Sequence, residues 1–207
     1  MPNREDIAKF EKLIGEVKRE GIDELMNWLK LKSDFYTAPA STRFHLACEG
    51  GLLRHSLNVC DCMFKKLENP VWKNILEDFG RESIIISSLL HDICKTNMYV
   101  KEYRSKKVYC PTGVRFDDGG NFNWETVVGY TVDDKVPYGH GEKSVMIIES
   151  YMKLTKQERY AIRWHMGFSV PSEEYNTLGT AMEKFPVILA LHEADMEASK
   201  LLEKDEQ

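Results

Sequence analysis

Ile84 to Lys95, I-I-I-S-S-L-L-H-D-I-C-K, is the stretch that decides the fold. Its apolar positions follow the spacing i, i+3, i+4 and i+7 at Ile86, Leu89, Leu90 and Ile93. This spacing predicts a buried helix. His91 and Lys95 are four residues apart and Asp92 is next to His91, so an ionisable cluster is expected at the end of that helix. Imidazole and carboxylate are ligands of divalent transition metals, and a desolvated His-Asp pair needs a partner. The stretch therefore predicts a metal site.

Length and composition are those of one soluble globular domain. The chain has 207 residues, 43% of them hydrophobic and 29% charged, and we expect a single domain over residues 1–207. No apolar run reaches the roughly 18 residues that a membrane span needs. The N-terminal residues M-P-N-R-E-D lack the apolar core of a signal peptide, which predicts a cytoplasmic protein without a membrane partner.

Cysteine usage and net charge indicate the redox compartment and the kind of partner that this protein would bind. The five cysteines are scattered and odd in number, which fits a reducing compartment and small buried side chains better than a disulfide framework. The net charge of -5 argues against a broad polyanion-binding surface but leaves a local basic site open.

Helical periods predict a mainly α fold. Residues 4–30 are expected to form two helices that break near Gly21, the second capped near Asp23, and residues 1–33 to cover a helical bundle. A helix after Gly50-Gly51 and a shorter one around residues 72–79 lead to the central stretch. Thr155 and Glu158 have the spacing of a capping box. Pro186 is expected to open the last helix, and residues 201–207 to fray.

Residues 96–138 lose the helical period and predict an inserted β-hairpin. Met98 to Tyr109 and Phe122 to Val132 are rich in strand-forming residues, and turn formers lie between them. The segment has a basic side, from which we select Arg104 and Arg115 as candidate phosphate-binding residues. A solvated strand face explains these charges equally well. The aromatic residues of the segment can stack on a base, although packing within a small core is the more common role of such residues.

Four more histidines are candidate site residues. His45 follows a loop and is either at the edge of a substrate pocket or a hydrogen-bonded structural histidine. His55 lies beside the apolar stripe of its helix, where a core histidine is the alternative to a ligand. His140 lies between two glycines before a helix, which permits close approach of a ligand to the backbone. His165 is expected in the last turn of a helix, where the helix dipole favours a bound cation.

The order of these residues resembles the HD-domain metal-dependent phosphohydrolase superfamily. The resemblance covers about residues 38–199, most of the chain, and is strongest to the HD domain of bacterial 3'-to-5' exoribonucleases. The matching segments are P-A-S-T (39–42), G-G-L-L-R-H-S (50–56), L-L-H-D-I-C-K (89–95), G-H-G-E-K-S (139–144), W-H (164–165) and L-H-E-A-D (191–195). The resemblance implies an HD-type helical bundle, with the hairpin as a small insertion.

The resemblance also implies a ligand set for one or two divalent ions. One ion would be held by His55, His91, Asp92 and Asp195. Asp92 would bridge to a second ion held by His140 and His165, and His192 would pack behind the ligands. Ligands of this kind suit Mn, Fe, Co, Ni, Zn or Mg. Asp92 and Lys95 are the expected catalytic residues, with Lys95 neutralising phosphoryl charge and, with His45, contacting substrate.

Three functions fit these expectations. The first is metal-dependent hydrolysis of a phosphate ester of a nucleotide or related small molecule. The second is 3'-to-5' exonuclease action on single-stranded nucleic acid, which should weaken steeply with salt. The third is a non-catalytic metal or nucleotide sensor.

Overall fold

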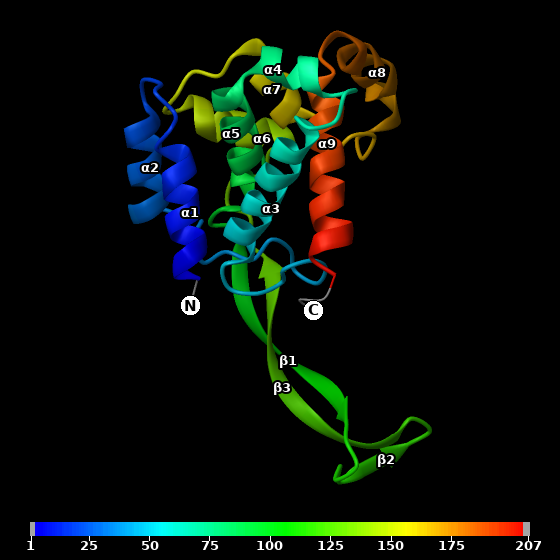
Figure 1. Ribbon diagram of the computed structural model, residues 1–207. Coiled ribbons are helices and arrows are strands. Elements are labelled where there is room, and N and C mark those ends of the chain that lie inside the picture. The colour runs from blue at the N-terminus through cyan, green and yellow to red at the C-terminus, as the bar shows by residue number, and fades with distance from the viewer. Residues whose placement is uncertain (1–2, 205–207) are drawn as a thin grey trace.

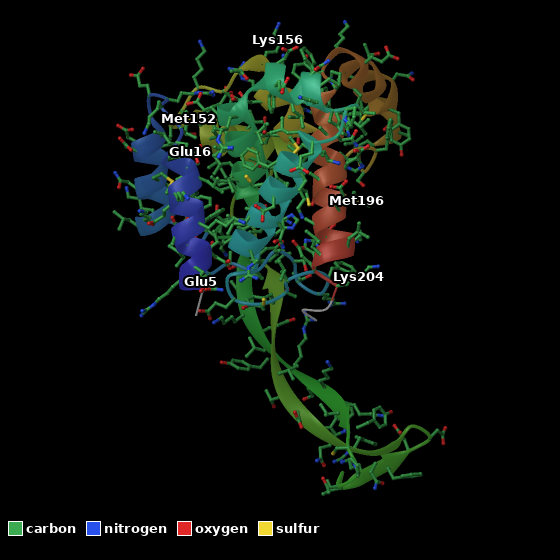
Figure 2. All side chains as sticks on the ribbon, in the orientation of Figure 1. Glu5, Glu16, Met152, Lys156, Met196 and Lys204 are labelled. Atoms are coloured by element: carbon green, nitrogen blue, oxygen red, sulfur yellow. The ribbon has the colours of Figure 1, made fainter. Side chains whose placement is uncertain are left out.

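The computed structural model describes residues 3–204 and is mainly helical with one small antiparallel sheet (Figures 1 and 2). The α-helices are α1 (Arg4–Ile14), α2 (Ile22–Leu31), α3 (Gly51–Lys66), α4 (Lys73–Phe79), α5 (Arg81–Leu90), α6 (His140–Glu149), α7 (Lys156–Arg163), α8 (Tyr175–Lys184) and α9 (Val187–Glu197). The strands are β1 (Tyr99–Tyr109), β2 (Arg115–Asp117) and β3 (Gly120–Val132). Two short 3-10 helices, η1 (Ile93–Lys95) and η2 (Ser172–Glu174), and a π-helix, η3 (Ala198–Leu202), complete the set.

Helices α3 and α5 form the centre of the bundle. They pack on each other, α9 packs on α3, and α7 packs on α5 and α9. Every residue from Ser83 to Leu90 is buried, which explains the continuous apolar run there. The central helix is shorter than predicted, because it ends at Leu90 and the chain turns through His91-Asp92 into η1. The carbonyl of Ser88, one of the last four in α5, accepts a hydrogen bond from Nδ1–H of His91, so the imidazole helps to end the helix.

Helices α1 and α2 cover one side of the bundle, as predicted (Figure 1). Their buried residues Phe10, Leu25 and Leu29 join the same apolar cluster as α3 and α5. The start of α2 differs from the prediction, because Gly21 and not Asp23 is the N-cap. Gly21 has φ 88°, and a Cβ there would lie 1.9 Å from the carbonyl oxygen of Tyr151, so only glycine fits.

The predicted hairpin is present, and we call residues 99–132 the arm. The strand order is β1-β3-β2, with antiparallel pairs from Tyr99 opposite Val132 to Tyr109 opposite Phe122. Figure 1 shows the arm extending away from the helices, with β2 near its far end. Because none of the described helices covers the arm along β1 and β3, large side chains such as Tyr103 (77% exposed) face solvent.

The C-terminal segment is more ordered than predicted. Helix α9 continues through η3, and the side chain of Glu203 is buried, so fraying from residue 201 was wrong as far as residue 204. Residues 205–207 of that prediction lie outside the described part of the chain. Among the described residues, no helix combines the length and apolar character needed to cross a membrane.

Candidate metal centre

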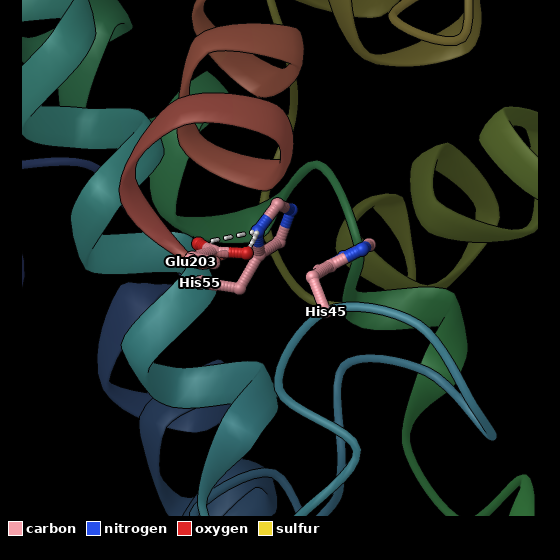
Figure 3. Close-up of side chains that lie close together, drawn as sticks. All are labelled: His45, His55 and Glu203. Atoms are coloured by element: carbon pink, nitrogen blue, oxygen red, sulfur yellow. Dashed lines mark hydrogen bonds and ion pairs between the residues drawn. The ribbon is translucent and has the colours of Figure 1, made fainter. Parts of the chain in front are cut away.

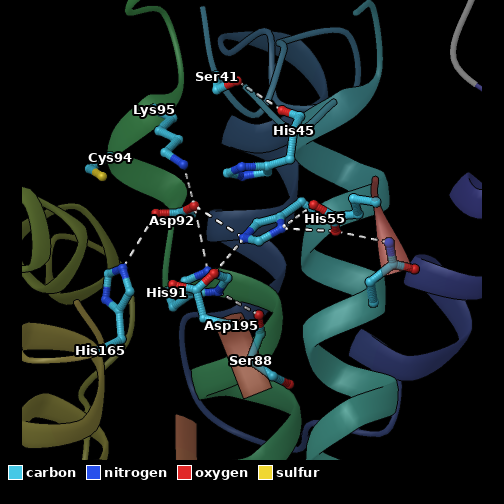
Figure 4. A network of polar contacts seen from close by, with 12 residues as sticks. Ser41, His45, His55, Ser88, His91, Asp92, Cys94, Lys95, His165 and Asp195 are labelled. Atoms are coloured by element: carbon cyan, nitrogen blue, oxygen red, sulfur yellow. Dashed lines mark hydrogen bonds and ion pairs between the residues drawn. The ribbon is translucent and has the colours of Figure 1, made fainter. Parts of the chain in front are cut away.

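Six side chains predicted as ligands lie together in the bundle, and Figure 4 labels all of them except His140. They are His55 on α3, His91 and Asp92 after α5, His140 at the start of α6, His165 after α7, and Asp195 on α9. Neighbouring imidazole rings are close, with centroid distances of 5.3 Å for His55–His91, 4.8 Å for His91–His165 and 5.1 Å for His140–His165. The six side chains are therefore close together, as the expected ligand set requires, and their binding of an ion stays a prediction.

Asp92 is the central residue of the cluster. Its Oδ2 lies 3.6 Å from Nε2 of His55 and 3.5 Å from Nε2 of His91. Its Oδ1 lies 2.8 Å from Nε2 of His140 and 3.5 Å from Nε2 of His165. Each carboxylate oxygen therefore faces its own pair of imidazoles.

The tautomers of His91 and His165 follow from their backbone contacts. Nδ1–H of His91 donates to the carbonyl of Ser88 at 2.8 Å, and Nδ1–H of His165 donates to the carbonyl of Ile162 at 2.7 Å. A carbonyl only accepts, so Nδ1 carries the proton and the lone pair of the neutral ring is on Nε2. Both Nε2 atoms are buried and have no hydrogen-bond partner within residues 3–204. Burial lowers the pKa of His91 to about 3, which keeps its ring neutral and able to bind a cation.

His55 lies between two carboxylates. Its Nδ1–H donates to Glu203 at 3.0 Å, and its Nε2 lies 3.2 Å from Oδ1 of Asp195. Burial disfavours the charged ring, but the bonds to Asp195 and Glu203 outweigh it and raise the pKa of His55 to about 9. Burial opposes ionisation of Asp195 too, yet His55 and the neighbouring imidazoles hold the pKa of that carboxyl well below its usual range.

Lys95 and Cys94 contact the Asp92 side of the cluster. Nζ of Lys95 lies 2.6 Å from Oδ2 of Asp92, which places this predicted catalytic residue in the site. Burial disfavours charge on Asp92, but Lys95 and then His91 hold its pKa well below the ordinary value. Sγ of Cys94 lies 3.2 Å from Nδ1 of His140, a contact that the sequence did not predict. Burial raises the pKa of Cys94 to about 12, so the group there is a thiol.

His45 also reaches the cluster (Figure 3). Its ring centroid is 4.9 Å from that of His55, and its buried Nε2 has no hydrogen-bond partner in the described part of the chain. The loop around it is held by the hydroxyl of Ser41, which donates to the carbonyl of His45 at 2.8 Å. Burial, with the nearby His55 and Lys95, lowers the pKa of His45 to about 4. The position agrees with the edge of a substrate site.

Two predicted substrate residues lie away from the cluster. Arg104 is in the middle of β1, pairs with Glu102 and donates to the carbonyl of Tyr130. Arg115 is on β2, opposite Phe122, near the far end of the arm (Figure 1). At about 3.3 Å per residue, β1 carries the chain roughly 30 Å from Tyr99 to the end where β2 pairs. Among the described contacts, neither arginine touches the cluster, and their selection as phosphate-binding residues stays a prediction.

The glycines around His140 have a packing role. A Cβ on Gly141 would lie 2.0 Å from the carbonyl oxygen of Arg163, so this glycine lets α6 approach α7. A Cβ on Gly139 would meet only the flexible side chain of Glu142. The G-H-G motif was predicted to let a ligand approach the backbone, whereas Gly141 brings His140 and His165 together. His192, predicted to pack behind the ligands, donates from Nδ1 to the carbonyl of His165 at 2.7 Å.

Glu203 is the site residue that the sequence analysis missed. It is buried, contacts His55, and lies eight residues after Asp195 in a charged tail. In a regular α-helix eight residues overshoot two turns by about 80°. The π-helix absorbs an extra residue, so Glu203 returns to the face of Asp195. The eight-residue spacing therefore gave no signal, because it matches the face of Asp195 only with the π-helix in place.

The donors fit a divalent cation. Buried groups of three donors, each within 4.8 Å of one another, include His55-His91-Asp195 and His91-Asp92-His165. The buried Nε2 atoms of His91 and His165, which have no hydrogen-bond partner among the described residues, lie beside carboxylates, and divalent transition metals bind donors of these two kinds. The cluster reaches solvent through His140, whose side chain is 33% exposed. A separate hollow of about 470 Å³ beside α6 and α7 is lined by none of the six donors, so it is not this site.

No protein-family model, curated protein or solved structure matches this chain. The resemblance to the HD-domain superfamily therefore stays a prediction from the order of the motif residues in the sequence.

Proposed function

We propose that this chain is an HD-type, divalent-metal-dependent phosphohydrolase that cleaves a phosphate ester of a nucleotide or related small molecule. The observation that carries the proposal is the arrangement around Asp92, whose Oδ2 faces His55 and His91 and whose Oδ1 faces His140 and His165. A carboxylate between two sets of imidazoles is suited to bridging two cations.

The residues divide into two ligand sets. His55, His91, Asp195 and Oδ2 of Asp92 would hold one ion, and His140, His165 and Oδ1 of Asp92 the other. Bound together, two divalent cations activate water and polarise a phosphoryl group for in-line attack. With both ions bound, Lys95 and the ions outweigh the charges of the nearby carboxylates. The site is then positive, which favours a phosphate dianion.

Lys95 and His45 are suited to holding the substrate. The Lys95 ammonium is attached to Asp92 and only 13% exposed, so it offers a fixed positive charge to the phosphoryl oxygens. His45 remains neutral at pH 7, because its pKa is lowered to about 4, and its Nε2 is available for a hydrogen bond. Together they bind and orient the phosphate ester beside Asp92.

The arm favours a second candidate, exonuclease action on single-stranded nucleic acid. Tyr103 and Trp124 are exposed on one face of β1 and β3, where aromatic rings can stack on bases, and Lys106 is exposed on the opposite face, where its charge can contact backbone phosphates. Such binding weakens steeply with salt, whereas turnover of a mononucleotide responds little. The salt dependence of turnover on oligonucleotides and mononucleotides separates the two functions.

The test combines metal analysis with a substrate screen. Purified protein is assayed with Mn²⁺, Co²⁺, Zn²⁺ or Mg²⁺ on phosphomonoesters, cyclic nucleotides and short oligonucleotides. We expect turnover that requires a divalent ion and is lost in Asp92→Asn but retained in Asp61→Asn, a change in an exposed ion pair. Metal binding without turnover on any of these esters would favour the sensor function instead.

A further inference from the structure

The buried carboxylate of Glu203 contacts a candidate ligand from behind. Oε1 of Glu203 accepts from Nδ1–H of His55 at 3.0 Å, and Oε2 lies 3.2 Å from the same nitrogen (Figure 3). Nδ2 of Asn58, one turn after His55 on α3, donates to Oε1 at 2.9 Å. These contacts fix the carboxylate on the side of the ring that faces away from Asp92 and Asp195.

The backbone after α9 is shaped to bring this side chain in. The amide of Glu203 donates to the carbonyl of Ala198 at 3.1 Å, the five-residue spacing of the π-helix η3. Ala198 is buried, whereas Leu201 and Leu202 are exposed. Apolar packing alone would bury the two leucines and expose the glutamate, but this segment does the opposite. Burying a carboxylate is costly unless it has specific partners, so the contact with His55 and Asn58 accounts for this geometry.

His55 is held differently from the other two buried imidazoles of the cluster. The Nδ1–H groups of His91 and His165 donate to neutral backbone carbonyls three residues earlier in the chain. Nδ1–H of His55 donates to an ionised side chain 148 residues away. When a cation displaces the proton on Nε2, a carboxylate behind the imidazole keeps the other proton on Nδ1 and makes Nε2 a stronger donor.

We propose that Glu203 is a positioning residue for His55: it fixes the ring so that Nε2 faces Asp92 and Asp195, and thereby strengthens binding of the cation at His55, His91 and Asp195. This inference rests on the proposed function only in requiring that the cluster bind a divalent cation. It assigns Glu203 to one of the two ligand sets, because its side chain contacts no donor of the His140 and His165 set among the described contacts.

The experiment compares Glu203→Ala and Glu203→Gln with the wild type by calorimetric titration with Zn²⁺. We expect Glu203→Ala to weaken the tighter binding step by about 10- to 100-fold, the usual effect of removing such a partner. Glu203→Gln should stay within a few-fold of the wild type, because its amide oxygen still accepts from Nδ1–H. The matched control is Glu197→Ala, which removes a partly exposed carboxylate that pairs with Lys66 near the same end of α9. This control should bind as the wild type does.

A spectroscopic measurement on the wild type does not depend on how the variants fold. In ¹⁵N-histidine-labelled protein saturated with Zn²⁺, we expect His55 to show a protonated Nδ1 with a slowly exchanging proton, and a metal-bound Nε2. A metal-bound Nδ1, or unchanged affinity in Glu203→Ala, would overturn the positioning role while leaving the metal site intact. If the wild type binds no Zn²⁺, Mn²⁺ or Co²⁺, both this inference and the proposed function are overturned.

Discussion

Replacing Asp92 by asparagine tests the centre of the site most directly. The change keeps the size of the side chain and one oxygen but removes the charge. In the wild type, Oδ2 of Asp92 lies 2.6 Å from Nζ of Lys95, with the two side chains 3% and 13% exposed. Lys9 and Asp61 have the same 2.6 Å separation at the surface, with side chains 45% and 41% exposed, so Asp61→Asn is a matched control.

The expected losses of folding stability in the two variants follow from this difference in burial. Removing one partner of a buried pair leaves a buried charge and costs about 3 kcal/mol, the low end of the usual range because Lys95 retains some contact with water. For a chain of this length that lowers Tm by roughly 6–12 °C. The exposed pair contributes less than about 1 kcal/mol, so Asp61→Asn should lower Tm by less than about 4 °C.

The same variant should lose its response to metal. A divalent ion at 100 times its Kd stabilises the wild type by about 2.7 kcal/mol, or roughly 5–11 °C in Tm. The assay is thermal and urea unfolding of both variants in EDTA and in saturating Mn²⁺ or Zn²⁺. If Asp92→Asn is as stable as Asp61→Asn in EDTA, or gains as much from the ion as the wild type, the reasoning about the Asp92 cluster is refuted.

Three further predictions concern packing, capping and thiol reactivity. Gly141→Ala should separate α6 from α7 and weaken Zn²⁺ binding measured by calorimetry, whereas Gly139→Ala should bind Zn²⁺ as the wild type does. Equal Zn²⁺ affinities of the two variants would contradict a role for the close approach of Gly141 to Arg163. Thr155→Ala removes the cap of α7 and should lower the free energy of unfolding in urea by about 1 kcal/mol. Thr155→Ser keeps the hydroxyl and should unfold like the wild type. If Thr155→Ala lowers the free energy of unfolding by less than about 0.3 kcal/mol, the capping box contributes little. Burial raises the pKa of Cys60 to about 11, so its thiolate fraction at pH 8 is about 100-fold below that of an ordinary thiol. Iodoacetamide should therefore alkylate Cys60 only when the protein unfolds, which mass spectrometry measures.

The sequence predicted the parts of the fold that local pattern determines. Apolar periodicity located the central helix, and the Thr155–Glu158 spacing identified a capping box that the structure contains. Strand-forming residues flanked by turn formers located the arm to within a few residues. The six donors converge as the motif order implied, because the helices that carry them pack around α3 and α5.

The remaining features depend on geometry that residue patterns do not contain. Arg104 and Arg115 were selected as phosphate-binding candidates by charge alone, and only the rise along β1 shows how far they lie from the six-residue cluster. Glu203 was hidden because its position depends on a π-helix, and no residue in the tail signals one. Cys94 contacts His140 because the chain turns after Leu90, a turn that the apolar period through Ile93 concealed.

The partners of His55 lie far apart along the chain, and this affects the order of events during synthesis. Residue 203 leaves the ribosome long after residue 55, so the imidazole emerges well before the carboxylate that holds it. Contacts between distant residues form late because closing long loops costs entropy. A nascent chain from which His55 and His91 have emerged, but not Asp195 and Glu203, would bind a cation weakly. High-affinity binding would begin once α9 and η3 have been synthesised and folded.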